Sequence, residues 1–134
     1  MLENDRFAAT PCNRLFAFRL VARSAQRVEL ELPVRPEFLQ EEGVLQGGIL
    51  TALADTAAVW LVWPDLPPAR GMTGIECSMR FLSSARADGG ALRATATPLR
   101  IGSTIAVCET VVTQGDRTVA KGTFTFLVRD RAAR

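Results

Sequence analysis

The chain has 134 residues, the size of one domain, and 48% of them are hydrophobic, which is enough to form a core without disulfides or metals. Charged residues make up 22%, the net charge is only +2 and the arginines are scattered, which argues against a disordered chain and against nucleic-acid binding. The sequence contains no histidine, and this excludes every mechanism that needs a histidine base or a histidine metal ligand. We therefore expect a single domain over residues 1–134 and no metal site.

The cysteines and the N-terminus bear on cellular location. Cys12, Cys77 and Cys108 form no closely spaced pair and have apolar neighbours, which predicts buried thiols in a reducing compartment. Residues 1–7 lack the basic and apolar regions of a signal peptide. Residues 44–63 are long enough to cross a bilayer, but Asp55 near their centre would cost about 3 kcal/mol there. We expect a cytoplasmic protein with no membrane partner.

The first half of the sequence predicts two strands, a loop and a helix. Residues 15–21 and 27–32 are expected to be strands, the second because apolar residues alternate with glutamates. Residues 36–45 are expected to form a loop. From residue 49 to 62 only Thr51, Asp55 and Thr56 are polar, and the Ala and Leu content favours a helix, which prolines end from position 64. A helix this apolar must be covered on nearly all sides, and we expect a second copy of the chain to help cover it.

The second half predicts four further strands, at residues 72–82, 91–99, 105–112 and 117–128. The sequence Gln114-Gly115-Asp116 is typical of a hairpin turn between the last two. Gly122 within the last strand predicts a bulge or the close approach of another backbone. One helix cannot cover both faces of such a sheet, so we predict an α+β domain in which an antiparallel sheet of five to six strands curls around one central helix.

Two glycines at the start of the predicted helix are candidates for an anion-stabilising site. Gly47 and Gly48 allow a ligand to approach the backbone, and N–H groups in the first helical turn have no partners inside the helix. The helix dipole adds positive charge there, so these groups could polarise a carbonyl. The alternative is that both glycines simply form a tight turn.

Asp55 is the candidate catalytic group, because an acid in an apolar helix loses hydration and its pKa rises toward that of a general base. Thr51, one turn earlier, could donate a hydrogen bond to it. The alternative is a structural aspartate satisfied by backbone or hydroxyl groups. Asp55 lies eight residues after Gly47, about 12 Å along a helix axis, which is too far for both to act on one carbonyl. If they cooperate, they come from two chains packed about a two-fold axis.

The residues from Gly43 to Ile49, followed by residues 53–57, resemble the hotdog-fold acyl-CoA thioesterases, in the branch that includes phenylacetyl-CoA and hydroxybenzoyl-CoA thioesterases. Residues 80–83 are similar to that family's strand after the helix, and the resemblance covers nearly the whole chain. It implies a helix wrapped by an antiparallel sheet, assembly into homodimers and often homotetramers, and hydrolysis of short-chain or aromatic acyl-CoA. It also implies no cofactor and no metal, since coenzyme A is part of the substrate.

The resemblance also implies roles for individual residues. The Gly47 N–H would polarise the thioester carbonyl, and Asp55 of the partner chain would activate water or attack the carbonyl directly. Gln46 stands where the family usually has His; it can hydrogen-bond a carbonyl but cannot carry a proton. The residues expected to contact substrate are Gly48, Gln40, Thr56, Thr73, Arg86, Arg100 and Ser103.

Some of these positions depart from the family's pattern. Gln40 stands where many relatives have Asn, and Gly74, with Thr73 beside it, stands where some relatives have a Ser or Thr that holds the catalytic water. Arg86, Arg100 and Ser103 are expected in loops, where they could meet the phosphates of coenzyme A. Trp60, Trp63 and Phe38 could line an acyl pocket, or could belong to the core or an interface.

Two functions remain compatible with these residues. The first is an acyl-CoA thioesterase that uses Asp55, Gly47 and Gln46. The second is a non-catalytic module that binds acyl-CoA, which the amides at positions 40 and 46 and the glycine at position 74 would permit. The hydratase chemistry of other hotdog proteins needs a histidine and is excluded.

Overall fold

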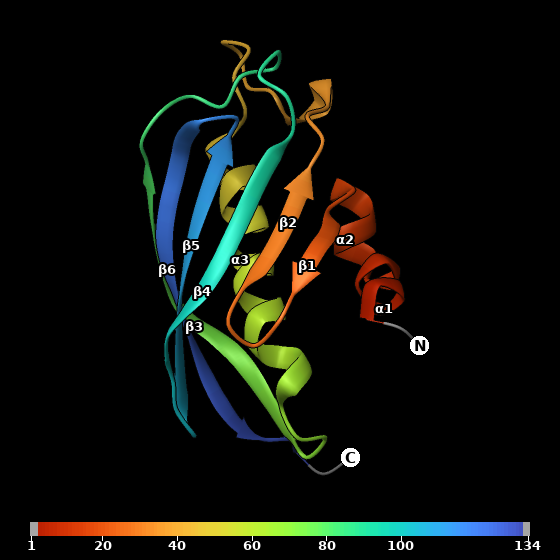
Figure 1. Cartoon of the computed structure of the whole chain (residues 1–134), viewed down its shortest axis with the longest axis vertical. Helices are drawn as coiled ribbons and strands as arrows, with labels where there is room; N and C mark the ends of the chain where they lie inside the picture. Colours follow the sequence, from red (N-terminus) through yellow and green to blue (C-terminus); the bar gives the residue numbers. More distant parts are fainter. Residues whose placement is uncertain (1–2, 133–134) are drawn as a thin grey trace.

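The computed structural model describes residues 3–132, which form one antiparallel sheet and a central helix (Figure 1). The elements in chain order are α1 (Glu3–Ala9), α2 (Pro11–Phe16), β1 (Arg19–Arg23), β2 (Val28–Leu32), η1 (Pro36–Phe38), α3 (Gly47–Val62), η2 (Trp63–Asp65), β3 (Arg70–Phe81), β4 (Leu92–Ile101), β5 (Ile105–Gln114) and β6 (Arg117–Asp130). The six strands lie in the order β1-β2-β4-β5-β6-β3, so β1 and β3 are the edges of the sheet.

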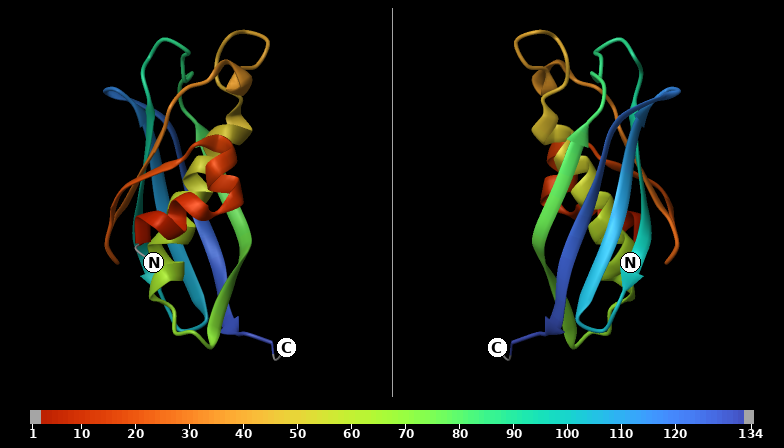
Figure 2. Two further views of the ribbon diagram at one scale, coloured as in Figure 1. Left: turned by 90° about the vertical axis from the view of Figure 1, so that its right-hand side faces the viewer. Right: turned by 90° about the vertical axis from the view of Figure 1, so that its left-hand side faces the viewer.

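The sheet curls around α3, as the two side views show (Figure 2). Strands β2, β4, β5 and β6 alternate between buried and more exposed residues, and their buried side chains pack on α3. Leu53, Ala54, Ala57 and Ala58 of the helix are completely buried in this core. The predicted α+β hotdog architecture is confirmed.

The N-terminal region differs from the prediction of a strand over residues 15–21. Residues 15 and 16 end α2, Ala17 adopts a left-handed conformation with φ 59°, and the strand begins only at Arg19. Pro11 at the first turn favours the start of α2, and the Asn13 amide donates a hydrogen bond of 2.9 Å to the Phe7 carbonyl. Helix α1 then packs Phe7 against Trp60 of α3, with ring centroids 5.0 Å apart. Neither of the two N-terminal helices was predicted.

Arg23 of β1 closes the C-terminal end of α3. Its guanidinium donates hydrogen bonds of 2.7 and 3.2 Å to the carbonyls of Trp60 and Leu61, which have no partners inside the helix. The same group pairs with Asp65 at 2.8 Å and Glu3 at 3.5 Å, while its side chain is only 8% exposed. The helix end, η2 and α1 are thereby tied to the sheet edge.

Predictions about the hairpin and Gly122 are confirmed, whereas the prediction of three buried thiols is wrong. Gly115 has φ +59° in the turn between β5 and β6. A Cβ at Gly122 would lie 2.6 Å from the carbonyl oxygen of Ser78, so the strand needs glycine there because a neighbouring backbone approaches closely. Cys108 is buried, and burial raises its pKa to about 11, but Cys12 and Cys77 are exposed.

The apolar segment Gly47–Asp65 meets the length and hydropathy of a membrane span. In the fold, its helix is the element that the sheet encloses, and burial in this core accounts for its composition.

Candidate active site

A groove runs between α3 and the edge strand β3. Gly48, Thr51, Ala52 and Asp55 line it from the helix, at spacings of three and four residues that place them on one face. The remaining walls are Gly74, Glu76 and Cys77 of β3 and Phe124 and Phe126 of β6, and the volume is about 540 Å³. The groove exists because α3 packs mainly on the other strands, while β3 lies at the edge and shifts register between Gly74 and Glu76.

Asp55 lies at the open side of this groove. In the single chain Asp55 is exposed, and the face of α3 that carries it is not covered by the sheet, which leaves the predicted covering by a second copy of the chain as a prediction. The groove walls still remove part of its hydration, and this desolvation raises the pKa of the Asp55 carboxyl above its ordinary value of 3.8. The expected bond from Thr51 is replaced by one to the Gly47 carbonyl, at 3.3 Å. Among residues 3–132 no side chain or backbone group donates a hydrogen bond to Asp55.

The start of α3 presents free backbone donors. Gln46 is the N-cap residue but its exposed side chain makes no capping hydrogen bond, and the first backbone bond at this end joins the Ile49 N–H to the Gln46 carbonyl. The N–H groups of Gly47 and Gly48 precede it and have no partner within the helix. A Cβ at Gly47 would lie 3.2 Å from the Phe81 ring, whereas Gly48 faces open space.

Asp55 and Gly47 are not brought together within one chain. Both lie on α3, eight residues apart, which corresponds to about 12 Å along the axis. This separation agrees with the prediction that any joint action needs two chains.

The side chains of several predicted substrate-binding residues form hydrogen bonds within the chain. The Gln40 side-chain oxygen accepts a hydrogen bond from the Glu42 N–H, in a turn where Gly43 has φ +80°. The Thr56 hydroxyl donates to the Ala52 carbonyl at 2.7 Å. The Thr73 hydroxyl accepts from Arg129 at 3.4 Å, and it is Gly74, not Thr73, that lines the groove with Asp55.

The three predicted phosphate-binding residues lie at two ends of the molecule. Arg86 is in the exposed loop that pairs with Val44, close to the start of α3. Arg100 is part of β4 and not of a loop as expected, and Ser103 lies in the turn that follows. That turn is next to the opposite end of β3, where Arg70 donates a hydrogen bond of 3.1 Å to the Ser103 carbonyl (Figure 1).

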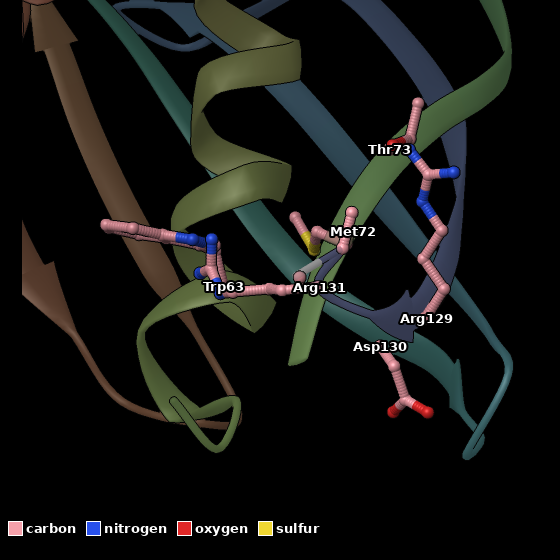
Figure 3. Close-up of a pocket in the computed structure, with 8 residues that line it drawn as sticks. Trp63, Met72, Thr73, Arg129, Asp130 and Arg131 are labelled. Atoms are coloured by element: carbon pink, nitrogen blue, oxygen red, sulfur yellow. Dashed lines mark hydrogen bonds between the residues drawn. The ribbon is translucent and has the colours of Figure 1, made fainter. Parts of the chain in front are cut away.

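One further cavity adjoins the groove and another lies beyond it, in the region where the sequence left open an acyl pocket lined by Trp60, Trp63 and Phe38. The first, about 330 Å³, is lined by Thr10, Val59, Trp60, Trp63, Met72, Gly74 and Phe126. The second, about 610 Å³, lies beyond it and is lined by Trp63, Gly71, Met72, Thr73, Arg129, Asp130, Arg131 and Ala132 (Figure 3). Trp60 and Trp63 line the first cavity, whereas Phe38 is buried in the core and lines neither cavity. The other lining residues are of types that are common in strands and gave no signal in the sequence.

Comparison with known proteins identifies the family. The sequence profile of the Thioesterase superfamily matches residues 42–121, which include the start of α3, Asp55 and β3. The chain belongs to the Thioesterase superfamily, and the resemblance seen in residues 43–57 is confirmed.

Individual proteins are similar to this chain in fold or in sequence. A thioesterase of Haemophilus influenzae superimposes with a TM-score of 0.87 at 22% identity, covering 97% of this chain and 92% of the other. A candidate thioesterase of Ralstonia eutropha, related to phenylacetic acid degradation, gives a TM-score of 0.83 at 25% identity over 89% and 90% of the two chains. A candidate esterase of Halobacterium salinarum is 39% identical over 85 residues, 61% of this chain and about half (54%) of that relative's length.

Proposed function

We propose that this protein hydrolyses acyl-CoA thioesters with short-chain or aromatic acyl groups, in a homodimer whose two sites each combine Asp55 of one chain with Gly47 of the other. The observation that carries the proposal is the arrangement on α3. A carboxyl group of raised pKa lies on the open face of the helix that also presents unpaired N–H groups at its start. Thioester hydrolysis needs a base or nucleophile and a donor to the carbonyl oxygen, and this helix supplies both.

The open edge of the sheet supports the dimer. Strand β3 is twelve residues long, has no proline and is exposed along most of its length. Ile75, Phe81 and Leu82 at this edge are 54%, 56% and 57% exposed, which is unusual for large apolar side chains. An edge of this kind is suited to pairing with another strand. If two β3 strands pair about a two-fold axis, the open faces of two α3 helices meet antiparallel, and each Asp55 faces the start of the other helix. A homotetramer would need a second interface, between two such dimers.

In this arrangement the Gly47 N–H binds the carbonyl oxygen and stabilises the negative charge that develops on it. A water molecule attacks the carbonyl carbon while Asp55 accepts its proton, the tetrahedral intermediate collapses, and the C–S bond breaks to release the coenzyme A thiolate and the free acid. In the alternative route, the Asp55 carboxylate attacks the carbonyl carbon, the C–S bond breaks to release the coenzyme A thiolate, and water then hydrolyses the mixed anhydride to the free acid and Asp55. Incorporation of oxygen-18 into Asp55 in a single turnover distinguishes the two routes.

Other residues contribute to binding in this proposal. Gln46 and Gly48 flank the oxyanion donor and contact the thioester, and Arg86 binds a phosphate of coenzyme A near the start of α3. The secondary binding roles expected from the resemblance belong to Gln40, Thr56, Thr73, Arg100 and Ser103. The side chains of Gln40, Thr56 and Thr73 would need to leave their present partners to fill these roles. No cofactor or metal takes part, and we propose a cytoplasmic location.

A pair of variants at Gly47 tests the oxyanion donor. Gly47→Pro removes the N–H, and proline suits the first position of a helix, particularly after Gln46 with φ −61° and ψ 129°. Gly47→Ala keeps the N–H and adds the same Cβ contact with Phe81. Thiol release from a panel of acyl-CoA substrates is expected to fall by about 100-fold or more in Gly47→Pro and by far less in Gly47→Ala. Equal activities in the two variants would contradict the role of this N–H.

A second candidate function is acyl-CoA binding without hydrolysis. It is favoured by two observations: within residues 3–132 no group hydrogen-bonds Asp55, and the neighbouring wall carries Gly74, which has no hydroxyl to hold a water molecule. Calorimetry that detects tight acyl-CoA binding, together with no thiol release over the whole substrate panel, would establish this function instead.

A further inference from the structure

We propose that Gly74 is the specificity-determining residue of the site, because it opens a passage from the Asp55 groove into an apolar chamber that takes the acyl group. This inference rests on the proposed function and names the part of the molecule that selects the substrate. The acyl chamber is the 330 Å³ cavity lined by Thr10, Val59, Trp60, Trp63, Met72, Gly74 and Phe126.

The connection between the two spaces is defined by two residues. Gly74 and Phe126 line both the groove that contains Asp55 and the acyl chamber. Gly74 has no side chain, and a Cβ built there would lie 3.7 Å from the Phe126 ring, an ordinary van der Waals contact. A Cβ is therefore accommodated at this position, and the atoms of a larger side chain would occupy the passage beside Phe126.

The chemistry of the chamber favours an uncharged, apolar acyl group. It has no charged residue in its lining, and its one hydroxyl belongs to Thr10. Trp60 and Trp63 meet edge to face with centroids 5.4 Å apart, a geometry that also suits an additional aromatic ring. The volume is near the lower end for ligand pockets, which fits one small acyl or aryl group and not a whole coenzyme. The chamber shares Gly74 and Phe126 with the groove that contains Asp55, so an acyl group placed in it would extend from a thioester held in that groove.

The walls of the chamber are held from outside. Arg6 of α1 stacks over the Trp63 ring at 4.9 Å, and Phe7 packs on Trp60. Helix α1 thus packs on both tryptophans from the side away from the chamber. Walls packed in this way favour discrimination between acyl groups of different size by the side chain at position 74.

Substrate profiles of Gly74→Val and Gly71→Val test the inference. Gly71 lies on the same strand, and a Cβ there would lie 3.6 Å from Arg131, but it does not line the acyl chamber, so it is the matched control. The ratio of kcat/KM for phenylacetyl-CoA to that for acetyl-CoA is expected to fall by about tenfold or more in Gly74→Val and to remain unchanged in Gly71→Val. An unchanged ratio in Gly74→Val, or the same fall in both variants, would overturn the inference.

A second readout does not depend on hydrolysis. Trp60 and Trp63 are the only tryptophans in the chain, so the two indole N–H signals in an NMR spectrum report on the chamber. Titration with 2-phenylethanol is expected to move both signals in the wild type and in Gly71→Val, with a Kd several-fold higher in Gly74→Val. Signals that do not move, or equal Kd values, would refute the chamber. If the probe binds as expected but no acyl-CoA is hydrolysed, the proposed function fails while the chamber stands.

Discussion

At the scale of single residues, the properties of Asp55 follow from where it lies on α3. The sequence predicted a desolvated acid, and the raised pKa confirms this, but the sequence could not show that the acid lies on an open face. That fact depends on which strand packs beside the helix, and β3 reaches its place only through pairing with β6. Likewise, the hydroxyls of Thr51 and Thr56 donate hydrogen bonds to backbone carbonyls of α3. The spacing of these residues in the sequence does not determine which acceptor each hydroxyl uses.

Asp55→Asn is expected to lower thiol release by about 100- to 10,000-fold, because the amide can neither accept the proton nor attack the carbonyl. The measurement is kcat with the best substrate of the acyl-CoA panel. Size-exclusion chromatography and circular dichroism should show the same assembly and fold as the wild type. An Asp55→Asn variant with full activity would remove Asp55 from the mechanism.

Asp55→Asn is also expected to be more stable than the wild type at neutral pH. A carboxyl whose pKa is raised by folding binds protons more readily in the folded state, so the free energy of unfolding decreases as the pH rises from the unfolded value of 3.8 through the folded pKa. Asparagine cannot ionise and avoids this loss. Thermal unfolding should give a higher Tm for Asp55→Asn at pH 7 and a difference that shrinks toward zero as the pH falls below 3.8. The rate of hydrolysis should change in the opposite sense, increasing with pH as Asp55 deprotonates.

At the scale of elements, the end of α3 depends on one arginine from a distant strand. Replacing Arg23 with Ala removes two hydrogen bonds to helix carbonyls and leaves Glu3 and Asp65 without their cation. Because the guanidinium is largely buried, the free energy of unfolding is expected to drop by about 3 kcal/mol, measured by urea denaturation. Arg27→Ala, which removes a surface pair with Glu29, is the control and should cost less than about 1 kcal/mol. Equal costs would show that Arg23 is not a structural cap.

The elements that the sequence predicted well are those with long, regular patterns. The alternation in residues 91–128 predicted β4, β5 and β6 because each strand has one face on the core and one face outside. The run Leu15-Phe16-Ala17-Phe18 was predicted as strand because a short apolar run has no period of its own. Its conformation is decided by tertiary contacts: Phe16 stacks on Phe18 at 5.1 Å, and Phe18 is buried in the core.

At the scale of the whole molecule, the proposed active site is a property of two chains, and mixing inactive variants tests this. Asp55→Asn and Gly47→Pro chains, each inactive alone, are unfolded together and refolded as a mixture. Half of the dimers should then be mixed, and each mixed dimer has one intact site, so about a quarter of the wild-type activity should return. If mass spectrometry demonstrates mixed dimers and no activity returns, then Asp55 of one chain and Gly47 of the other do not form a shared site.

The overall fold could be predicted from the sequence more completely than the site. The apolar helix followed by alternating strands defines a sheet that must wrap around the helix, and this outcome needs no detailed geometry. The site needs more, because Met72 and Gly74 of β3 and Phe126 of β6 come to lie beside α3 only when the sheet has curled around the helix. Their residue types are common in strands and carry no signal of their own.

Strand β3 is at once a wall of the groove and an unpaired edge of the sheet, which has a kinetic consequence. If the edge must meet its counterpart before a site is complete, every dissociation event also dismantles the catalyst. Specific activity would then decline on dilution and recover on concentration, with the midpoint reporting the strength of self-association. Turnover per chain would thereby be set by how much of the protein a cell contains.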